Sequence, residues 1–151
     1  MKIGVSAIAV GGVMFALVGC SQVQLKKPTS SGHAEGIFHS TTAEEAKSKI
    51  LSGCAVHGLV IEDSNGSQVT CSKTLQGMQA AMMQMTIGNS YSTTPQYKVR
   101  FVLISQANDV RVIAYPWAES MMPGGQVNKM EMNGNVQRNE LQSFMNSVGA
   151  E

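Results

Sequence analysis

Residues 41–73 read TTAEEAKSKILSGCAVHGLVIEDSNGSQVTCSK, and this stretch decides the fold. The two threonines at its start are each followed three positions later by a glutamate, which is the pattern of a capping box at a helix start. Apolar residues then recur at helical spacing as far as Cys54, and two extended runs follow with an Asn-Gly turn between them. The stretch therefore predicts a helix over residues 42–53 and a hairpin over 57–73.

The rest of the chain repeats this succession of helix and hairpin. A stripe of methionines predicts a second helix over residues 74–87, and two β-rich runs at 97–105 and 109–115 predict a second hairpin. Residues 126–132 add an optional edge strand, and an apolar stripe near the C-terminus predicts a last helix. We therefore expect an α+β domain: a two-layer antiparallel sheet of about four or five strands with the helices on one face, in the order α-ββ-α-ββ(β)-α.

The first residues have the architecture of an export signal: a short basic start, an apolar run and the residues Leu17-Val18-Gly19-Cys20. The run is short for a permanent membrane span, which needs about 20 apolar residues. Its end resembles the lipobox of bacterial lipoproteins. The resemblance implies cleavage before Cys20, a diacylglyceryl group on its sulfur and an acyl chain on its new amino terminus, and we expect no other cofactor. Ser21 follows in place of the aspartate that tends to retain such proteins at the inner membrane, so the resemblance implies anchoring at the periplasmic face of an outer membrane.

Three regions follow from this pattern. Residues 1–19 are the expected signal peptide, residues 20–39 the lipidated N-terminus with a flexible tether, and residues 40–151 the single α+β domain. The tether is predicted because its segment has few apolar residues with no sustained period, and it carries Lys26, Lys27, Pro28, Ser30, Ser31 and Gly32. The element order after a long tether looks like the helix-grip or TATA-protein-like domains of envelope lipoproteins, such as the BamC subunit of the barrel assembly machinery. This likeness carries no site residues across.

Two cysteines remain in the mature chain, Cys54 and Cys71. In an oxidising compartment an even pair predicts a structural disulfide, which would tie the end of the first helix to the hairpin. Two separate buried thiols remain the alternative. A redox pair is disfavoured because the C-x-x-C spacing that lowers a thiol pKa is absent.

The chain has 11 methionines, and thioethers are soft ligands that suit Cu(I). However, Met78, Met82 and Met85 recur at the spacing needed to cover a sheet, and the three histidines show no paired metal spacing. We therefore predict that these methionines pack in the core, that Met83 points elsewhere, and that the chain has no metal site.

Trp117 is the single tryptophan, and Met121 and Met122 follow it in an apolar stretch that reads as a loop. If exposed, these three residues are a candidate surface for a partner. Alternatively the stretch folds over one end of the sheet.

Catalytic motifs are missing from the sequence: it has no nucleophile elbow, phosphate-binding glycine loop or H-E-x-x-H. Eleven basic and ten acidic residues leave a formal charge of +1, too little to concentrate nucleic acid. We therefore expect a non-enzymatic lipoprotein of the envelope, attached to the membrane through its lipid and binding a protein partner or complex. The alternative is a binder of a lipid or other apolar ligand in a helix-grip pocket; an enzyme would need a buried cluster of perturbed titratable groups.

Overall fold

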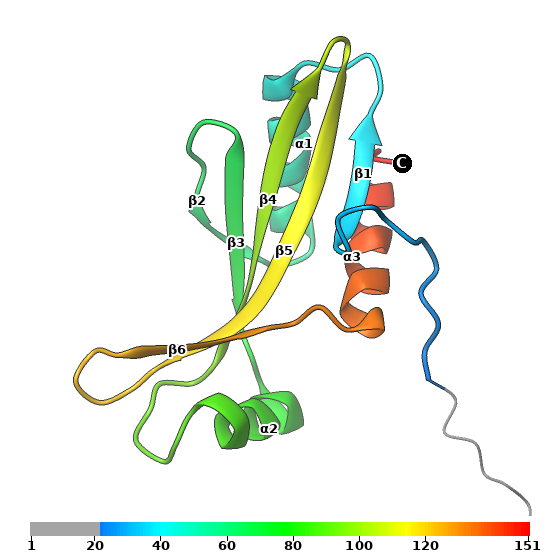
Figure 1. The fold of residues 1–151 in the computed structure, drawn as a ribbon. Coiled ribbons are helices and arrows are strands. Elements are labelled where there is room, and N and C mark those ends of the chain that lie inside the picture. The colour runs from blue at the N-terminus through cyan, green and yellow to red at the C-terminus, as the bar shows by residue number, and fades with distance from the viewer. Residues whose placement is uncertain (1–21) are drawn as a thin grey trace, which may run out of the picture.

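A long antiparallel hairpin, β4 (Gln96–Gln106) and β5 (Asp109–Met121), forms the centre of the fold in a computed structural model that describes residues 22–151 (Figure 1). Within these residues the other strands are β1 (Ala34–Phe38), β2 (Val60–Asp63), β3 (Gln68–Thr74) and β6 (Val127–Glu131). The helices are α1 (Ala43–Val56), α2 (Gly77–Ile87) and α3 (Asn135–Ser147). The expected signal peptide and Cys20 lie outside the described residues.

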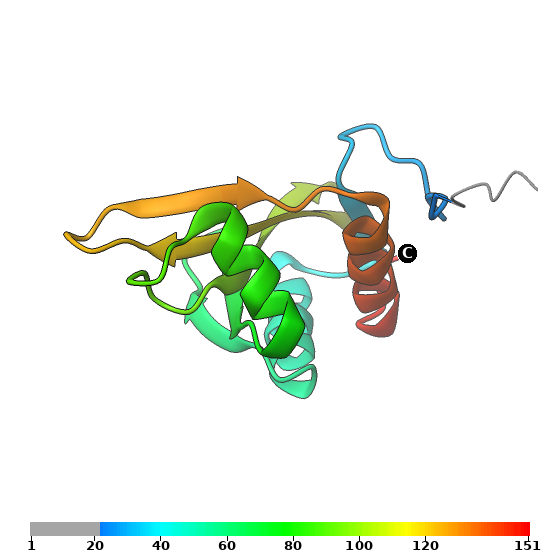
Figure 2. The same cartoon turned by 90° about the horizontal axis from the view of Figure 1, so that it is seen from below.

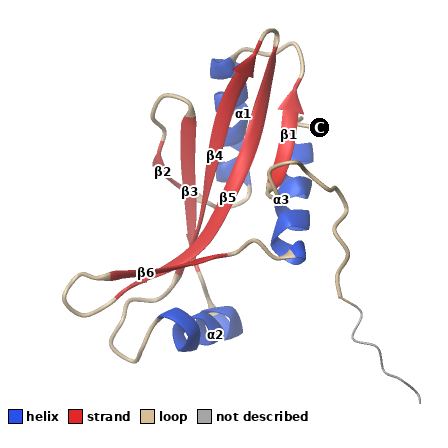
Figure 3. Cartoon of the chain, viewed as in Figure 1, coloured by secondary structure: helices blue, strands red, loops and turns tan. Residues whose placement is uncertain are grey.

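The six strands form one antiparallel sheet in the order β2-β3-β4-β5-β1, with β6 also paired to β5 (Figure 3). One edge of β5 carries two partners in succession, because β1 pairs with residues 110–114 and β6 with residues 117–121. Pro116 lies between these two segments, and its carbonyl accepts a hydrogen bond from the Met132 N–H at 3.1 Å. The proline nitrogen faces the same edge and has no hydrogen to donate. Pro116 therefore occupies the position between the segment paired with β1 and the segment paired with β6, where no backbone donor is needed.

The helices lie on one side of the sheet, which gives the two layers (Figure 2). Phe101 of β4 stacks on Phe144 of α3 with ring centroids 5.1 Å apart, and both side chains belong to the buried core. A Cβ at Gly53 would come within 2.4 Å of Val148, so the glycine lets α1 approach the end of α3 closely. The predicted α+β class and the placement of helices on one face are confirmed, and the sheet has one more strand than the expected maximum.

The predicted start of the first helix is also confirmed. The Glu45 N–H donates to Thr42 Oγ1 at 3.3 Å, and the Thr42 N–H donates to Glu45 Oε2 at 3.2 Å. This reciprocal capping box satisfies two backbone donors that the first turn of a helix leaves without partners.

The predicted boundary of the folded domain at residue 40 is wrong, because β1 belongs to the sheet. Ala34, Gly36 and Phe38 alternate with more exposed residues and face the core. A Cβ at Gly36 would lie 2.8 Å from Ala150, so the strand also packs closely against the C-terminus. Five residues in a polar context give a weak sequence signal, and this strand gains its backbone hydrogen bonds from β5, far along the chain.

The segment before β1 also contacts the domain. The Asn135 side chain donates to the carbonyl of Val23 and the Asn139 side chain donates to the carbonyl of Gln24, both at 2.8 Å. The Lys26 N–H donates back to Asn139 Oδ1 at 2.8 Å. The first described residues are therefore fixed along the N-terminal half of α3, where the sequence predicted a tether.

Candidate functional site

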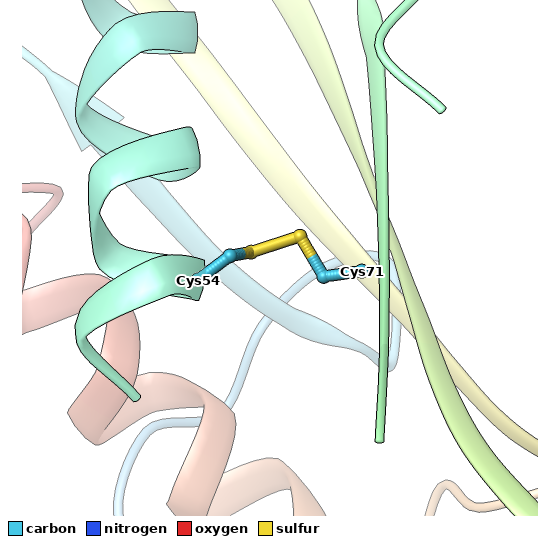
Figure 4. Close-up of a disulfide and its surroundings, with 2 residues drawn as sticks. All are labelled: Cys54 and Cys71. Carbon is cyan, nitrogen blue, oxygen red and sulfur yellow. A yellow bond between two sulfur atoms is a disulfide. The ribbon is translucent and has the colours of Figure 1, made fainter. Parts of the chain in front are cut away.

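The disulfide joins Cys54, in the last turns of α1, to Cys71 in the middle of β3 (Figure 4). The two Cα atoms are 6.4 Å apart, and both cysteines are fully buried. The predicted pairing is confirmed. Its burial in the core suits a structural crosslink between the helix layer and the sheet.

A groove opens between α2 and α3 over the adjoining part of the sheet. We call it the α2–α3 groove; its cavity volume is about 690 Å³. Its floor comes from β3 and β4, and its walls come from the two helices and the segments next to them. The apolar side chains that line it are Leu59, Leu75, Met82, Met83, Tyr97, Val99, Phe101, Met132, Val136, Leu141 and Phe144. This mixture of aliphatic, aromatic and thioether groups is typical of a site for an apolar occupant.

The groove also has polar lining side chains, which are His57, Lys73, Thr74, Gln76, Gln79, Tyr97, Gln137 and Glu140. The Tyr97 hydroxyl makes no hydrogen bond to any described residue, although its side chain is partly buried in the groove wall. Burial raises the pKa of Tyr97 strongly, and the nearby Glu140 carboxylate raises it further. The phenol is therefore protonated at any physiological pH and is a free hydrogen-bond donor for an occupant of the groove.

The prediction that the methionines of the second helix pack in the core is wrong. Met78, Met82 and Met85 are 76%, 64% and 88% exposed, and the buried side chain of α2 is Ile87. Met83, which was predicted to point elsewhere, is partly buried and lines the α2–α3 groove. The three methionines of the predicted stripe are therefore exposed, and of these Met82 also lies at the rim of the α2–α3 groove.

Trp117 lies in a strand and not in a loop, because β5 continues through Pro116 to Met121. Its partly buried indole lies on the face of the sheet opposite the helices. The indole N–H donates to Glu119 Oε2 at 2.7 Å, while Arg100 and Lys129 lie 5.8 and 5.7 Å from the ring centroid. These cationic groups lie within the range of a cation–π contact.

The surroundings of Trp117 form a shallow cleft of about 450 Å³ on that face. Although burial alone would raise the pKa of Glu119, hydrogen bonds from Trp117 and Lys98 lower it below its usual value. Met121 is exposed at the end of the same strand, and the partly buried Met122 begins the following turn. The structure therefore places Trp117 and Met121 along one strand face and brings neither into the α2–α3 groove.

A histidine and a serine also approach each other, and the histidine is one of the residues that line the groove. His57 Nε2 and Ser147 Oγ are 3.4 Å apart, but the serine hydroxyl donates to the Phe144 carbonyl at 2.7 Å. No carboxylate pairs with His57 within residues 22–151. This pair therefore lacks the third group that would orient a histidine base.

Among residues 22–151 no group of three or more histidine, cysteine, aspartate or glutamate side chains is placed to hold a metal ion. In the same part of the chain no helix is long and apolar enough to cross a membrane.

Sequence reasoning did not identify the α2–α3 groove as a defined site. Its walls come from four separate segments between residues 57 and 144, and each apolar residue in them also fits an ordinary core position. The one local signal was the methionine-rich helix, of which Met82 and Met83 line the groove, but its spacing does not say which surface these side chains contact.

Comparison with protein-family models, with curated proteins and with solved structures finds no match to this chain.

Proposed function

We propose that this chain is a non-enzymatic lipoprotein of the bacterial envelope that binds an apolar segment of a protein partner in the α2–α3 groove. The anchor would be the acylated Cys20, at the periplasmic face of an outer membrane. The leader and the residues Leu17-Val18-Gly19-Cys20 support this anchoring. The observation that carries the binding function is the open groove itself, because a domain of this size usually fills such a space with its own side chains.

The exposure of the groove rim favours a protein segment. Met82 is 64% exposed and Val136 is 44% exposed, so the apolar lining continues from the groove floor onto the molecular surface. Small ligands are generally enclosed on most sides, whereas a partner segment can lie along an open groove and cover its rim. Methionine side chains adapt their shape to different apolar surfaces, which suits such a contact.

A small apolar ligand, such as a lipid, is the second candidate. The volume of about 690 Å³ is large enough for one, and the unpaired Tyr97 hydroxyl would donate to its polar end. Both candidates use the same lining residues, so the identity of the captured molecule distinguishes them.

The test is crosslinking in intact cells from a photoreactive residue at position 79, since Gln79 is exposed and lines the groove. We expect a discrete protein adduct from the membrane fraction. A photoreactive residue at position 104 is the matched control, because Ile104 is exposed on the opposite face of β4.

The adduct at position 79 should fall several-fold with Val136→Glu, which places an unpaired carboxylate at the groove rim. Val60→Glu, an equally drastic change at an exposed position outside the groove, should leave it unchanged. A lipid adduct would favour the second candidate function, the binding of a small apolar ligand. The same adducts at positions 79 and 104, or none at position 79, would overturn the groove as a binding site.

In parallel, Cys20→Ser should abolish labelling with palmitate and release the protein from the membrane fraction.

A further inference from the structure

The outward side of α2 is unusual for a water-exposed helix surface. Met78, Met82 and Met85, which we call the methionine face, are all more than half exposed. The helix has the sequence GMQAAMMQMTI and contains no charged residue. Exposed helix surfaces in water normally carry charged side chains opposite their buried stripe, so this face is suited to a partner that is itself apolar.

The helix α2 lies at the end of the molecule where the described chain begins. Figure 1 shows both α2 and the first described residues at the lower end of the domain, and Figure 2, seen from below, shows α2 in front. Met82 and Met83 of α2 line the same groove as Val136 and Gln137 in the first turn of α3. That turn is also where Asn135 holds the Val23 carbonyl.

This attachment limits how far the domain can stand from a lipid on Cys20. Only three residue steps separate Cys20 from Val23, and a fully extended chain covers about 3.5 Å per residue, or about 11 Å in all. A free tether as far as residue 39 would instead have allowed the domain to stand several times farther away. The first turn of α3 is therefore held close to the membrane surface whenever Cys20 is embedded.

The segments at this end also carry exposed apolar side chains. Val23 is 50% exposed, Val136 is 44% exposed, and Tyr91, in the loop after α2, is 85% exposed. At the opposite end the Thr41 N–H donates to the Asn108 carbonyl, so the start of α1 lies beside the turn between β4 and β5. That end carries the charged side chains of Glu44, Glu45, Lys47 and Asp109, which favour water over an apolar boundary.

We infer that the methionine face of α2 lies against the bilayer surface beside the lipid anchor, as a second membrane contact of this protein. The inference rests on the proposed anchoring through Cys20. Uncharged methionine side chains would enter the boundary between headgroups and acyl chains, as interfacial helices do. The contact orients the domain, with α2 against the membrane and the turn between β4 and β5 farthest from it.

The test uses the full lipidated chain in vesicles of phosphatidylethanolamine and phosphatidylglycerol. Met85→Cys, labelled with a fluorophore that reports an apolar environment, should lose at least about half of its fluorescence when the vesicles contain brominated phospholipid, because the probe enters the acyl boundary. Ile104→Cys, labelled in the same way on the far half of β4, should lose almost none. Met78→Cys serves as a second probe position if the first variant folds poorly, since Met78 is 76% exposed.

Flotation of the vesicles tests the lipid anchor separately from the membrane contact of α2. Equal quenching at positions 85 and 104 in protein that floats with the vesicles would overturn the membrane contact and leave the anchor intact. Protein that does not float would overturn the anchor and the contact together. In intact cells, a photoreactive residue at position 85 should capture phospholipid; a protein adduct there would overturn the inference in favour of a docking surface for a protein.

Discussion

The helices α1 and α2 each precede a hairpin, and each has an apolar stripe at helical spacing, yet they end in opposite environments. In α1 the stripe formed by Ala46, Ile50 and Cys54 is fully buried against the sheet. In α2 the corresponding stripe is the methionine face, which is exposed. The comparison shows that an apolar period predicts a helix with an apolar side, but it does not predict what that side will contact.

The difference follows from where each helix meets the sheet. The helix α1 packs over β2, β3 and β4, and the disulfide fixes it there. The helix α2 instead contacts β5 and β6, and Ile87 is its one buried side chain. Burial along α1 stabilises the fold, whereas the outward side of α2 is available for contacts outside the domain.

The largest expected effect is that of Ile50→Ala in α1. Ile50 is fully buried in the core, so removing three methyl or methylene groups there should lower the free energy of unfolding by about 2–5 kcal/mol. Urea unfolding followed by circular dichroism measures this loss. A loss below about 1 kcal/mol would mean that α1 is not packed as tightly as its burial indicates.

The disulfide should contribute almost as much. Replacing both Cys54 and Cys71 with alanine should lower the free energy of unfolding by about 3 kcal/mol, since the bond closes a loop between residues 17 positions apart. Reduction of the wild-type protein should have a similar effect, and a reductant should leave the double variant unchanged. If reduction does not shift the wild-type urea midpoint, the crosslink does not hold α1 to the sheet energetically.

The smallest expected effect is on the methionine face. Met78→Gln combined with Met85→Gln should change the free energy of unfolding by no more than about 0.5 kcal/mol, because both side chains are largely exposed. The same urea titration in the absence of membranes measures it. A loss comparable to that of Ile50→Ala would show that these side chains are buried in solution, and the contrast between the two helices would disappear.

Several features of the fold could be predicted because they depend on residues close together in the chain. The capping box of α1 needs residues three positions apart, and the hairpin between β2 and β3 needs an apolar run on either side of an Asn-Gly turn. The disulfide was also predictable, because Cys54 and Cys71 are the two cysteines that remain once Cys20 is assigned to the lipid.

Other features could not be predicted because they depend on distant partners. The strand β1 is short and becomes part of the sheet only because Ala34 pairs with Ala114, far along the chain. A proline commonly ends a strand, but β5 continues past Pro116 since β6 replaces β1 at that point of the edge. The predicted loop around Trp117 is therefore a strand.

The sequence by itself determined the order of the helices and of strands β2 to β6, the start of α1 and the pairing of the two core cysteines, because local spacing and chemistry fix each of these. Only the tertiary structure decided that Met78, Met82 and Met85 of α2 are exposed, that the α2–α3 groove stays open, and that residues 23–26 lie along α3. The physical reason is that burial is a property of surfaces brought together from distant parts of the chain, and each local pattern is compatible with more than one such surface.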